Sequence, residues 1–285
     1  MTHPPLAYYW RVSAPDRPEL SLERMNRFQE PEARRIIQEL DLPSASHGLD
    51  VGCGVGLYAL WLAEAVGPAG RVTALEPEVS RVDAARSLTA GQPGADRVEF
   101  RVGDGTTLPV PDQSVDWLWC GDVLHHIVDT ERALREFARV VRPSGRIVIK
   151  ESQMLSALFL PGHPELERRI QIAEIRRTLE EGAGRSFQER RQTTLPALRA
   201  AGLASSVMRH YLLERRAPLR PADRDYIQHT VFSRNWGERI RDLLTAAEWR
   251  ERSRLCEPGS ADNVLLDPDY FCLYPISVFI AAKLA

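Results

Sequence analysis

Hydrophobic and polar positions change their period along this chain, and the changes divide it into segments. Between residues 47 and 151, short β-rich runs alternate with patterns of helical period. The runs are GLDV, RVTALE, RVEFRV, SVDWLWC and GRIVIK, and helices are expected over 57–66, around 80–88 and over 130–141. This alternation predicts an α/β fold of parallel strands joined by right-handed helical crossovers, with ligands bound at the carboxyl ends of the strands.

The flanking segments show helical patterns. Residues 1–46 contain PEARRIIQEL, in which Pro31 suits a first helical turn, and we interpret this segment as an N-terminal helical lid. A later run, PELERRIQIAEIRRTLEEG, places Leu166, Ile170 and Ala173 on one helical face. We interpret this run as an insertion over the ligand site.

The rest of the chain is expected to return to the sheet. TTLPALRAAGL predicts a core helix that leads into a strand near 207–213, and YPISVFIAAK predicts the last strand. Between these strands, Ile240, Leu243, Leu244 and Ala247 follow the i, i+3, i+4, i+7 spacing of an amphipathic helix. The predicted organisation is a lid over 1–46 and a domain over 47–285, with helical cap insertions at about 152–190 and 215–269.

Composition and charge narrow the classes of partner. Hydrophobic residues make up 44% and charged residues 27% of the 285 residues, which is typical of a globular protein. The formal net charge of −2 gives no field that would attract nucleic acid or anionic lipid, so we expect a small-molecule substrate. No run approaches the length of a membrane span, and the four scattered cysteines indicate neither a disulfide framework nor a metal site. A cytoplasmic location is the expectation.

A glycine-rich loop, LDVGCGVG at 49–56, is the strongest local signal. Its spacing is G-x-G-x-G, whereas the nicotinamide fingerprint would require a third glycine where Leu57 stands. Asp50 lies two residues before the first glycine, and a carboxylate there favours a bound ammonium over a pyrophosphate. Taken alone, the loop would also suit an ordinary tight strand-to-helix turn.

Two further strand ends carry acidic residues. Glu76 ends the second predicted strand, where an acid can accept hydrogen bonds from a ribose diol, as it also does in NAD sites. Asp104 and Gly105 follow the third strand, where the carboxylate could accept from the exocyclic amine of adenine. A plain Asp-Gly turn is the alternative for that pair.

These motifs, with CGDVLHHIVD and ALREFARVVRPSGRIVIKE, resemble the class I methyltransferases that use S-adenosylmethionine (SAM). The resemblance covers about residues 46–151 and is greatest to the small-molecule enzymes similar to ubiquinone and menaquinone methyltransferases. It implies a doubly wound, Rossmann-like sheet of seven strands, mostly parallel, with the last strand antiparallel. It also implies these contacts with SAM: Asp50, Gly52 and Gly54 at the methionine part, Glu76 at the ribose, Asp104 with Gly105 at the adenine, and Cys120, Gly121 and Asp122 beside the sulfonium.

The chain departs from the family's pattern in two places. His47 and Gly48 stand where the family has apolar strand residues, which weakens the first strand. The excursion over about 215–269 is longer than the family's connection. Together with the earlier insertion, it indicates a substrate cap, so the acceptor cannot be carried over from the wider family.

Methyl transfer requires positioning more than a particular nucleophile of the protein. An oxygen or acidic carbon acceptor would need a general base, whereas a neutral amine would need only orientation. His125 and His126, after the fourth strand, and Glu151, at the end of the fifth, are the candidate catalytic residues. A structural role for each of them remains the alternative.

The aromatic residues are assigned mainly to packing. Tyr8, Tyr9 and Trp10 could cover the cofactor, but a hydrophobic anchor is the favoured interpretation. Trp117 and Trp119 alternate with apolar neighbours and are expected in the core.

Three other functions compete with a small-molecule methyltransferase. An RNA or protein methyltransferase would need a basic groove, for which only ERRAPLR near residue 217 offers a local patch. A non-catalytic, SAM-binding regulatory protein would keep the same motifs. A nucleotide-dependent oxidoreductase is disfavoured by Leu57 and Asp50. The predicted cap favours a bulky or apolar acceptor that is shielded from water.

Overall fold

The computed structural model describes residues 18–180, 187–203 and 206–282, so Tyr8, Tyr9 and Trp10 lie outside the described residues. Its seven-stranded sheet has the order β3-β2-β1-β4-β5-β7-β6. Strands β1 to β5 pair in parallel, and β7 runs antiparallel to β5, which confirms the predicted topology. The strands are β1 (His47–Val51), β2 (Arg71–Glu76), β3 (Val98–Val102), β4 (Val115–Gly121), β5 (Val141–Ser152), β6 (Ser206–Arg216) and β7 (Phe271–Ala282).

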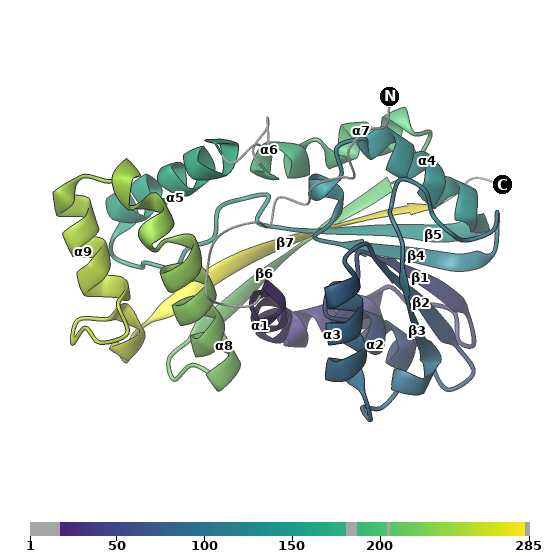
Figure 1. Cartoon of the computed structure of the whole chain (residues 1–285), viewed down its shortest axis with the longest axis horizontal. Coiled ribbons are helices and arrows are strands. Elements are labelled where there is room, and N and C mark those ends of the chain that lie inside the picture. Colours follow the sequence, from purple (N-terminus) through teal and green to yellow (C-terminus); the bar gives the residue numbers. More distant parts are fainter. Residues whose placement is uncertain (1–17, 181–186, 204–205, 283–285) are drawn as a thin grey trace. The chain divides into compact units, whose positions relative to one another are not determined.

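The α-helices follow the predicted alternation through the parallel part of the sheet. Figure 1 shows α2 and α3 on one side of the parallel strands and α4 and α7 on the other, as expected of a doubly wound sheet. None of the helices in the described part of the chain is long and apolar enough to cross a lipid bilayer. The helices are α1 (Pro18–Glu39), α2 (Leu57–Ala65), α3 (Val79–Thr89), α4 (Thr130–Val140), α5 (Pro164–Thr178), α6 (Phe187–Gln192), α7 (Thr194–Ala200), α8 (Pro221–Asp225) and α9 (Ala246–Cys256).

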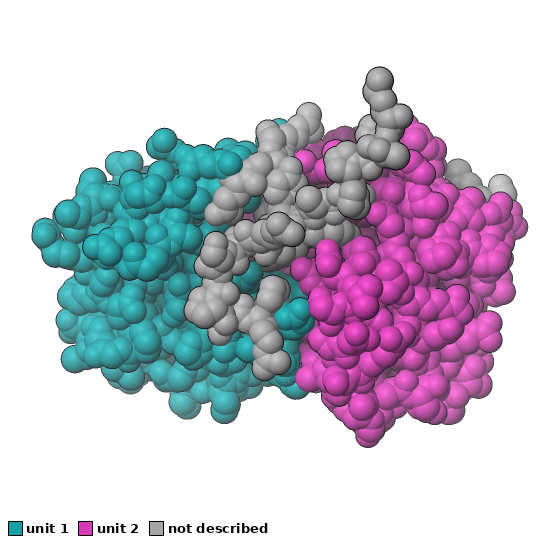
Figure 2. Space-filling model, viewed as in Figure 1, with its two compact units in different colours: residues 1–28, 156–189, 214–274 teal, residues 29–155, 190–213, 275–285 magenta. Residues whose placement is uncertain are grey.

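The chain forms two compact units (Figure 2). Unit 1 comprises the described parts of 1–28, 156–189 and 214–274, and unit 2 those of 29–155, 190–213 and 275–285. Most of both predicted insertions therefore folds within unit 1. A covering role for these segments stays a prediction.

Unit 1 is mainly helical and has an aromatic core. Phe28 stacks on Tyr226 at a ring-centroid distance of 4.5 Å and meets the edge of Tyr274 at 5.4 Å. Phe159 and Phe232 both contact Trp236. On α5, the predicted apolar face is confirmed because its three apolar residues, Leu166, Ile170 and Ala173, are buried.

Unit 2 contains the core beneath the parallel strands. Leu49, Leu118 and Ile149 are fully buried in it, together with Phe137 of α4 and Leu198 of α7. The expectation that Trp117 and Trp119 belong to the core is confirmed, since each is 1% exposed.

Two predicted details are wrong. Pro31 lies inside α1 and not in a first turn. It is on the exposed face of the helix, where water can bond the carbonyl group that the proline leaves without a backbone donor. The amphipathic helix expected over 240–247 is interrupted, because a 3-10 helix ends at Leu243 and Thr245 caps a new helix, α9, through a capping box with Glu248.

Gly48 does not weaken β1 but makes room for an indole ring. A Cβ atom at this position would lie 2.0 Å from the ring of Trp117 on the neighbouring strand. We expect Gly48→Ala to lower the free energy of unfolding by about 1–3 kcal/mol through overpacking. Gly259→Ala is the matched control, because nothing lies within 4 Å of a Cβ atom there. Equal denaturant midpoints for the two variants would contradict this account.

Candidate active site

The glycine loop at the carboxyl end of β1 is fixed by close packing. Gly52 and Gly56 have φ angles of 76° and 83°, in the region that favours glycine. A Cβ atom at Gly52 would lie 2.3 Å from the side chain of Val123, and one at Gly56 would lie 2.7 Å from Phe100. The loop therefore needs glycine at both positions. Gly54, between them, also has a positive φ of 56°.

Asp50 is a buried acid with an unused oxygen. Its side chain is 1% exposed, and its Oδ2 atom has no hydrogen-bond partner among the described residues. Burial, with the nearby charge of Glu76, raises the pKa of Asp50 to about 8. A buried acceptor of this kind suits a cationic ligand group.

Glu76 joins the end of β2 to the glycine loop. Its Oε2 atom accepts a hydrogen bond from the backbone N–H of Gly54 at 3.1 Å, and its Oε1 atom lies 3.3 Å from the guanidinium of Arg81. Burial raises the pKa of Glu76, and Arg81 opposes that shift. The sequence analysis missed Arg81, although its place five residues after an acidic strand end was a possible signal.

Asp104 and Gly105 form a local turn after β3. The Oδ1 atom of Asp104 accepts from the backbone N–H of Thr106 at 2.6 Å and from its hydroxyl at 2.7 Å. A Cβ atom at Gly105 would lie 3.0 Å from Ile127 and 3.3 Å from Val51. The turn alternative thus describes the local geometry, and the contact with adenine stays a prediction.

The residues after β4 lie in a crowded, buried place. Cys120 is fully buried, and a Cβ atom at Gly121 would lie 2.7 Å from the indole nitrogen of Trp119. Asp122 has a positive φ of 56°, and its Oδ1 atom accepts from the backbone N–H of Ser152 at 2.6 Å. Its carboxylate therefore fastens the loop after β4 to the end of β5.

Lys150 completes a buried polar network around Asp122. Its ammonium group is 1% exposed and donates to Asp122, to Gln29 at 2.5 Å and to Ser152 at 2.8 Å. Gln29 also accepts from the hydroxyl of Tyr58 at 3.0 Å. Burial disfavours the carboxylate of Asp122, but the charges of Lys150 and Arg191 outweigh it and lower its pKa to about 2.

Sequence reasoning missed this network. The only signal was that Lys150 is one of two lysines among 37 basic residues and stands at a strand end. Gln29 lies far away in the sequence and gave no signal at all.

His125 and Glu151 form a buried pair. The Nδ1 atom of His125 lies 2.6 Å from the Oε2 atom of Glu151, and the backbone N–H of His125 donates to Oε1 at 3.3 Å. Burial raises the pKa of Glu151 to about 8 and lowers that of His125 well below its usual value. His126 lies beside this pair, with its ring centroid 4.1 Å from that of His125, and is partly exposed. The structure thus brings the three candidate catalytic residues together.

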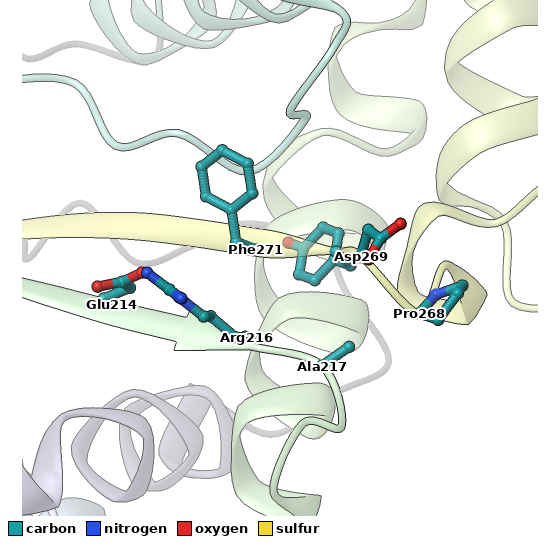
Figure 3. Close-up of a pocket in the computed structure, with 7 residues that line it drawn as sticks. Glu214, Arg216, Ala217, Pro268, Asp269 and Phe271 are labelled. Carbon is teal, nitrogen blue, oxygen red and sulfur yellow. The ribbon is translucent and has the colours of Figure 1, made fainter.

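A pocket of about 390 Å³ lies elsewhere, within unit 1 (Figure 3). Its lining includes Glu214 and Arg216 of β6 and Phe271 of β7, and it contains no residue predicted for the site. Arg216 pairs with Glu214, while Arg215 and Arg220 both bond Asp223. The three arginines of the ERRAPLR patch therefore each pair with a carboxylate, and two of them share Asp223.

Comparison with known proteins defines the class of the domain. The sequence profile of the family described as a methyltransferase domain matches residues 49–149, which span most of strands β1 to β5 and the residues predicted to bind the cofactor. This part of the chain is a methyltransferase domain of the class I type, and the cofactor of such domains is SAM.

Two curated relatives match somewhat less than half of the chain. Methyltransferase GfsG of Streptomyces halstedii is 35% identical over 46% of this chain and 46% of its own length. Demethylmenaquinone methyltransferase of Lactobacillus johnsonii is 31% identical over 42% of this chain and 49% of its own length. The chain therefore spans less than half the length of these relatives.

A solved structure supports the same fold. The putative methyltransferase of Bacillus halodurans superposes on 88% of this chain and 99% of its own, with a TM-score of 0.54 and 17% identity. At this identity the likeness shows the fold alone.

The residues present fit SAM. The unused buried oxygen of Asp50 suits the ammonium of its methionine part. A bound ammonium would favour the ionised form of Asp50, so binding at neutral pH should release a proton. We expect the affinity for S-adenosylhomocysteine to rise from pH 6 to pH 8, by up to about tenfold per unit.

Calorimetry at several pH values and in buffers of different ionisation enthalpy would measure this proton release. Asp50→Asn should bind more weakly and lose the pH dependence, because the amide cannot titrate. A pH-independent affinity in the unaltered protein would remove Asp50 from the ammonium site.

Proposed function

We propose that this protein transfers the methyl group of SAM to an oxygen or acidic carbon atom of a small, largely apolar acceptor. When bound, SAM supplies an electrophilic methyl group, and the electron pair of the broken C–S bond stays on sulfur. The buried His125–Glu151 pair at the ends of β4 and β5 is the observation that carries the proposal. A simple amine acceptor would not need such a base.

Residues at each strand end would bind a different part of SAM. Asp50, Gly52 and Gly54 would hold the methionine part, and Glu76 would accept from the ribose hydroxyls. Asp104 with Gly105 would face the adenine. Cys120, Gly121 and Asp122 would border the sulfonium, with Asp122 kept in place by Lys150.

His125 is the favoured general base. Glu151 accepts a hydrogen bond from one nitrogen of its ring and would stabilise the imidazolium that forms when the other nitrogen takes a proton. Glu151 is fully buried and acts through His125. His126 lies beside this pair, with its ring centroid 4.1 Å from that of His125, and is the second candidate.

An apolar acceptor is supported by two side chains of unit 2. Val128 follows β4 and is 61% exposed, and Leu155 follows β5 and is 67% exposed. Exposed aliphatic residues at ligand-binding strand ends suit an apolar molecule. The menaquinone precursor named for one relative is a molecule of that character.

The proposal includes a cytoplasmic location, since the four buried, unpaired thiols suit a reducing compartment. An RNA substrate is disfavoured by the paired arginines of the ERRAPLR segment. A regulatory protein that binds SAM without turnover remains the second candidate.

Methyl-labelled SAM and a panel of apolar phenols, quinols and amines would test the function. We expect label in phenols or quinols, and little in amines. Label transferred only to added RNA or protein would contradict the proposed substrate class. Tight cofactor binding without turnover on any acceptor would favour the regulatory candidate.

A further inference from the structure

Arg191 of α6 contacts the far side of the His125–Glu151 pair. One terminal guanidinium nitrogen lies 3.0 Å from the Nε2 atom of His125, and the Nε atom lies 3.5 Å from Glu151. The side chain is only 18% exposed. Two anchors hold this part of the chain, because Gln192 donates to the carbonyl of Met154 at 3.0 Å and Leu198 of α7 lies in the core.

This contact determines where the proton of His125 lies. A guanidinium has only donors, so the Nε2 atom that faces Arg191 must present its lone pair. The single proton of the neutral ring is then on Nδ1, which donates to Glu151. Glu151 then accepts from Nδ1–H at Oε2 and from the backbone N–H of His125 at Oε1.

We propose that Arg191 is a positioning residue that keeps His125 in the Nδ1–H tautomer and selects acceptors with an ionisable hydroxyl group. The inference rests on the proposed function. The acceptor hydroxyl takes the place of the guanidinium N–H at Nε2 and gives its proton to that nitrogen. The guanidinium then lies beside the oxygen, where its positive charge stabilises the anion that forms.

The charges around the His125–Glu151 pair favour an acceptor with an ionisable hydroxyl group over a protonated amine. The charged and titratable groups around the pair include Cys120, Asp122, His126, Lys150, Arg190 and Arg191. Lys150, Arg190 and Arg191 are the cations among them, and Lys150 is already engaged by Asp122. A protonated amine would be repelled by Arg191 at the position where a hydroxyl oxygen is stabilised.

Nitrogen NMR of the protein labelled with 15N-histidine tests the inference without turnover. We expect an unprotonated Nε2 and a protonated Nδ1 for His125 near pH 7, with the resonance assigned by its loss in His125→Asn. Arg191→Met should remove the donor at Nε2 and raise the pKa of Glu151 further, so that a protonated Glu151 donates to Nδ1 and the ring proton moves to Nε2. Arg191→Lys should restore the Nδ1–H tautomer in part. Arg190→Met is the matched control, because it removes a neighbouring charge but leaves the donor at Nε2.

A second measurement follows the pH profile with a phenol acceptor. Loss of the positive charge should raise the pKa of the pair, so the acidic limb of kcat/KM should move to higher pH in Arg191→Met. At neutral pH we expect a loss of roughly 10- to 100-fold with the phenol, and none with an amine.

The outcomes separate this inference from the proposed function. An Nε2–H tautomer in the unaltered protein, or an unchanged tautomer in Arg191→Met, would overturn the role of Arg191 even if methyl transfer is robust. The predicted tautomers support it even if the true acceptor is absent from the panel. Because the first result does not depend on Arg191→Met, a folding defect in that variant would not prevent the test.

Discussion

Replacing Asp122 with alanine should lower the free energy of unfolding by about 3–5 kcal/mol, because it leaves the buried ammonium of Lys150 without its counter-ion. Lys150 is 1% exposed, and the two neutral groups that also accept from it cannot replace a charge. Burial already lowers the pKa of Lys150, and Asp122 opposes that shift. Chemical denaturation of the ligand-free protein would measure the loss.

The loss of stability in Asp122→Ala should also depend on pH. In Asp122→Ala the pKa of Lys150 falls further in the folded state, so the unfolded chain binds the proton more tightly. Stability of the variant should therefore rise as the pH increases above neutrality, relative to the unaltered protein.

Two variants control for simple loss of contacts. Adding Lys150→Met to Asp122→Ala should recover part of the stability, because no charge is then left buried. Glu99→Ala breaks an exposed pair with Arg101 and should cost less than about 1 kcal/mol. If Asp122→Ala cost no more than Glu99→Ala, the buried pair would not hold the loop after β4.

His125→Asn should reduce kcat for an acceptor with an ionisable hydroxyl by about 10²- to 10⁴-fold, because the general base is lost. Glu151→Gln should also reduce kcat, since the imidazolium loses the carboxylate that lies 2.6 Å from Nδ1. Affinity for S-adenosylhomocysteine should change little in either variant, because neither residue is assigned to cofactor binding.

His126→Asn is the matched control for this pair. The two histidines are neighbours in sequence, but only His125 has the buried contact with Glu151. We expect His126→Asn to retain most of the activity in steady-state assays with the same acceptor. A greater loss of activity for His126→Asn than for His125→Asn would contradict the assignment of His125 as the general base.

The parallel part of the fold was predictable because its signals are local. Runs such as RVTALE and SVDWLWC have strand composition and stand next to helices of clear period. The antiparallel last strand came from the family resemblance, and its pairing with β5 confirms it. The wrong details at Pro31 and Thr245 arose because exposure and capping decide where a helix continues or ends.

The residues of the candidate site were predictable only where a sequence motif places them at the end of a strand. Asp50, Glu76 and Asp122 stand at such ends, and motif spacing singles them out. Gln29 and Arg191 act through contacts with residues elsewhere in the chain, which no local pattern encodes. Gly48 was misjudged for the same reason, because the ring that requires it belongs to another strand.

Calorimetric titration of the purified protein with S-adenosylhomocysteine and, separately, with NAD tests the central claim most directly. The account predicts micromolar binding of S-adenosylhomocysteine and none of NAD, since Asp50 precedes a glycine loop that lacks the third nicotinamide glycine. Binding of NAD alone would contradict it.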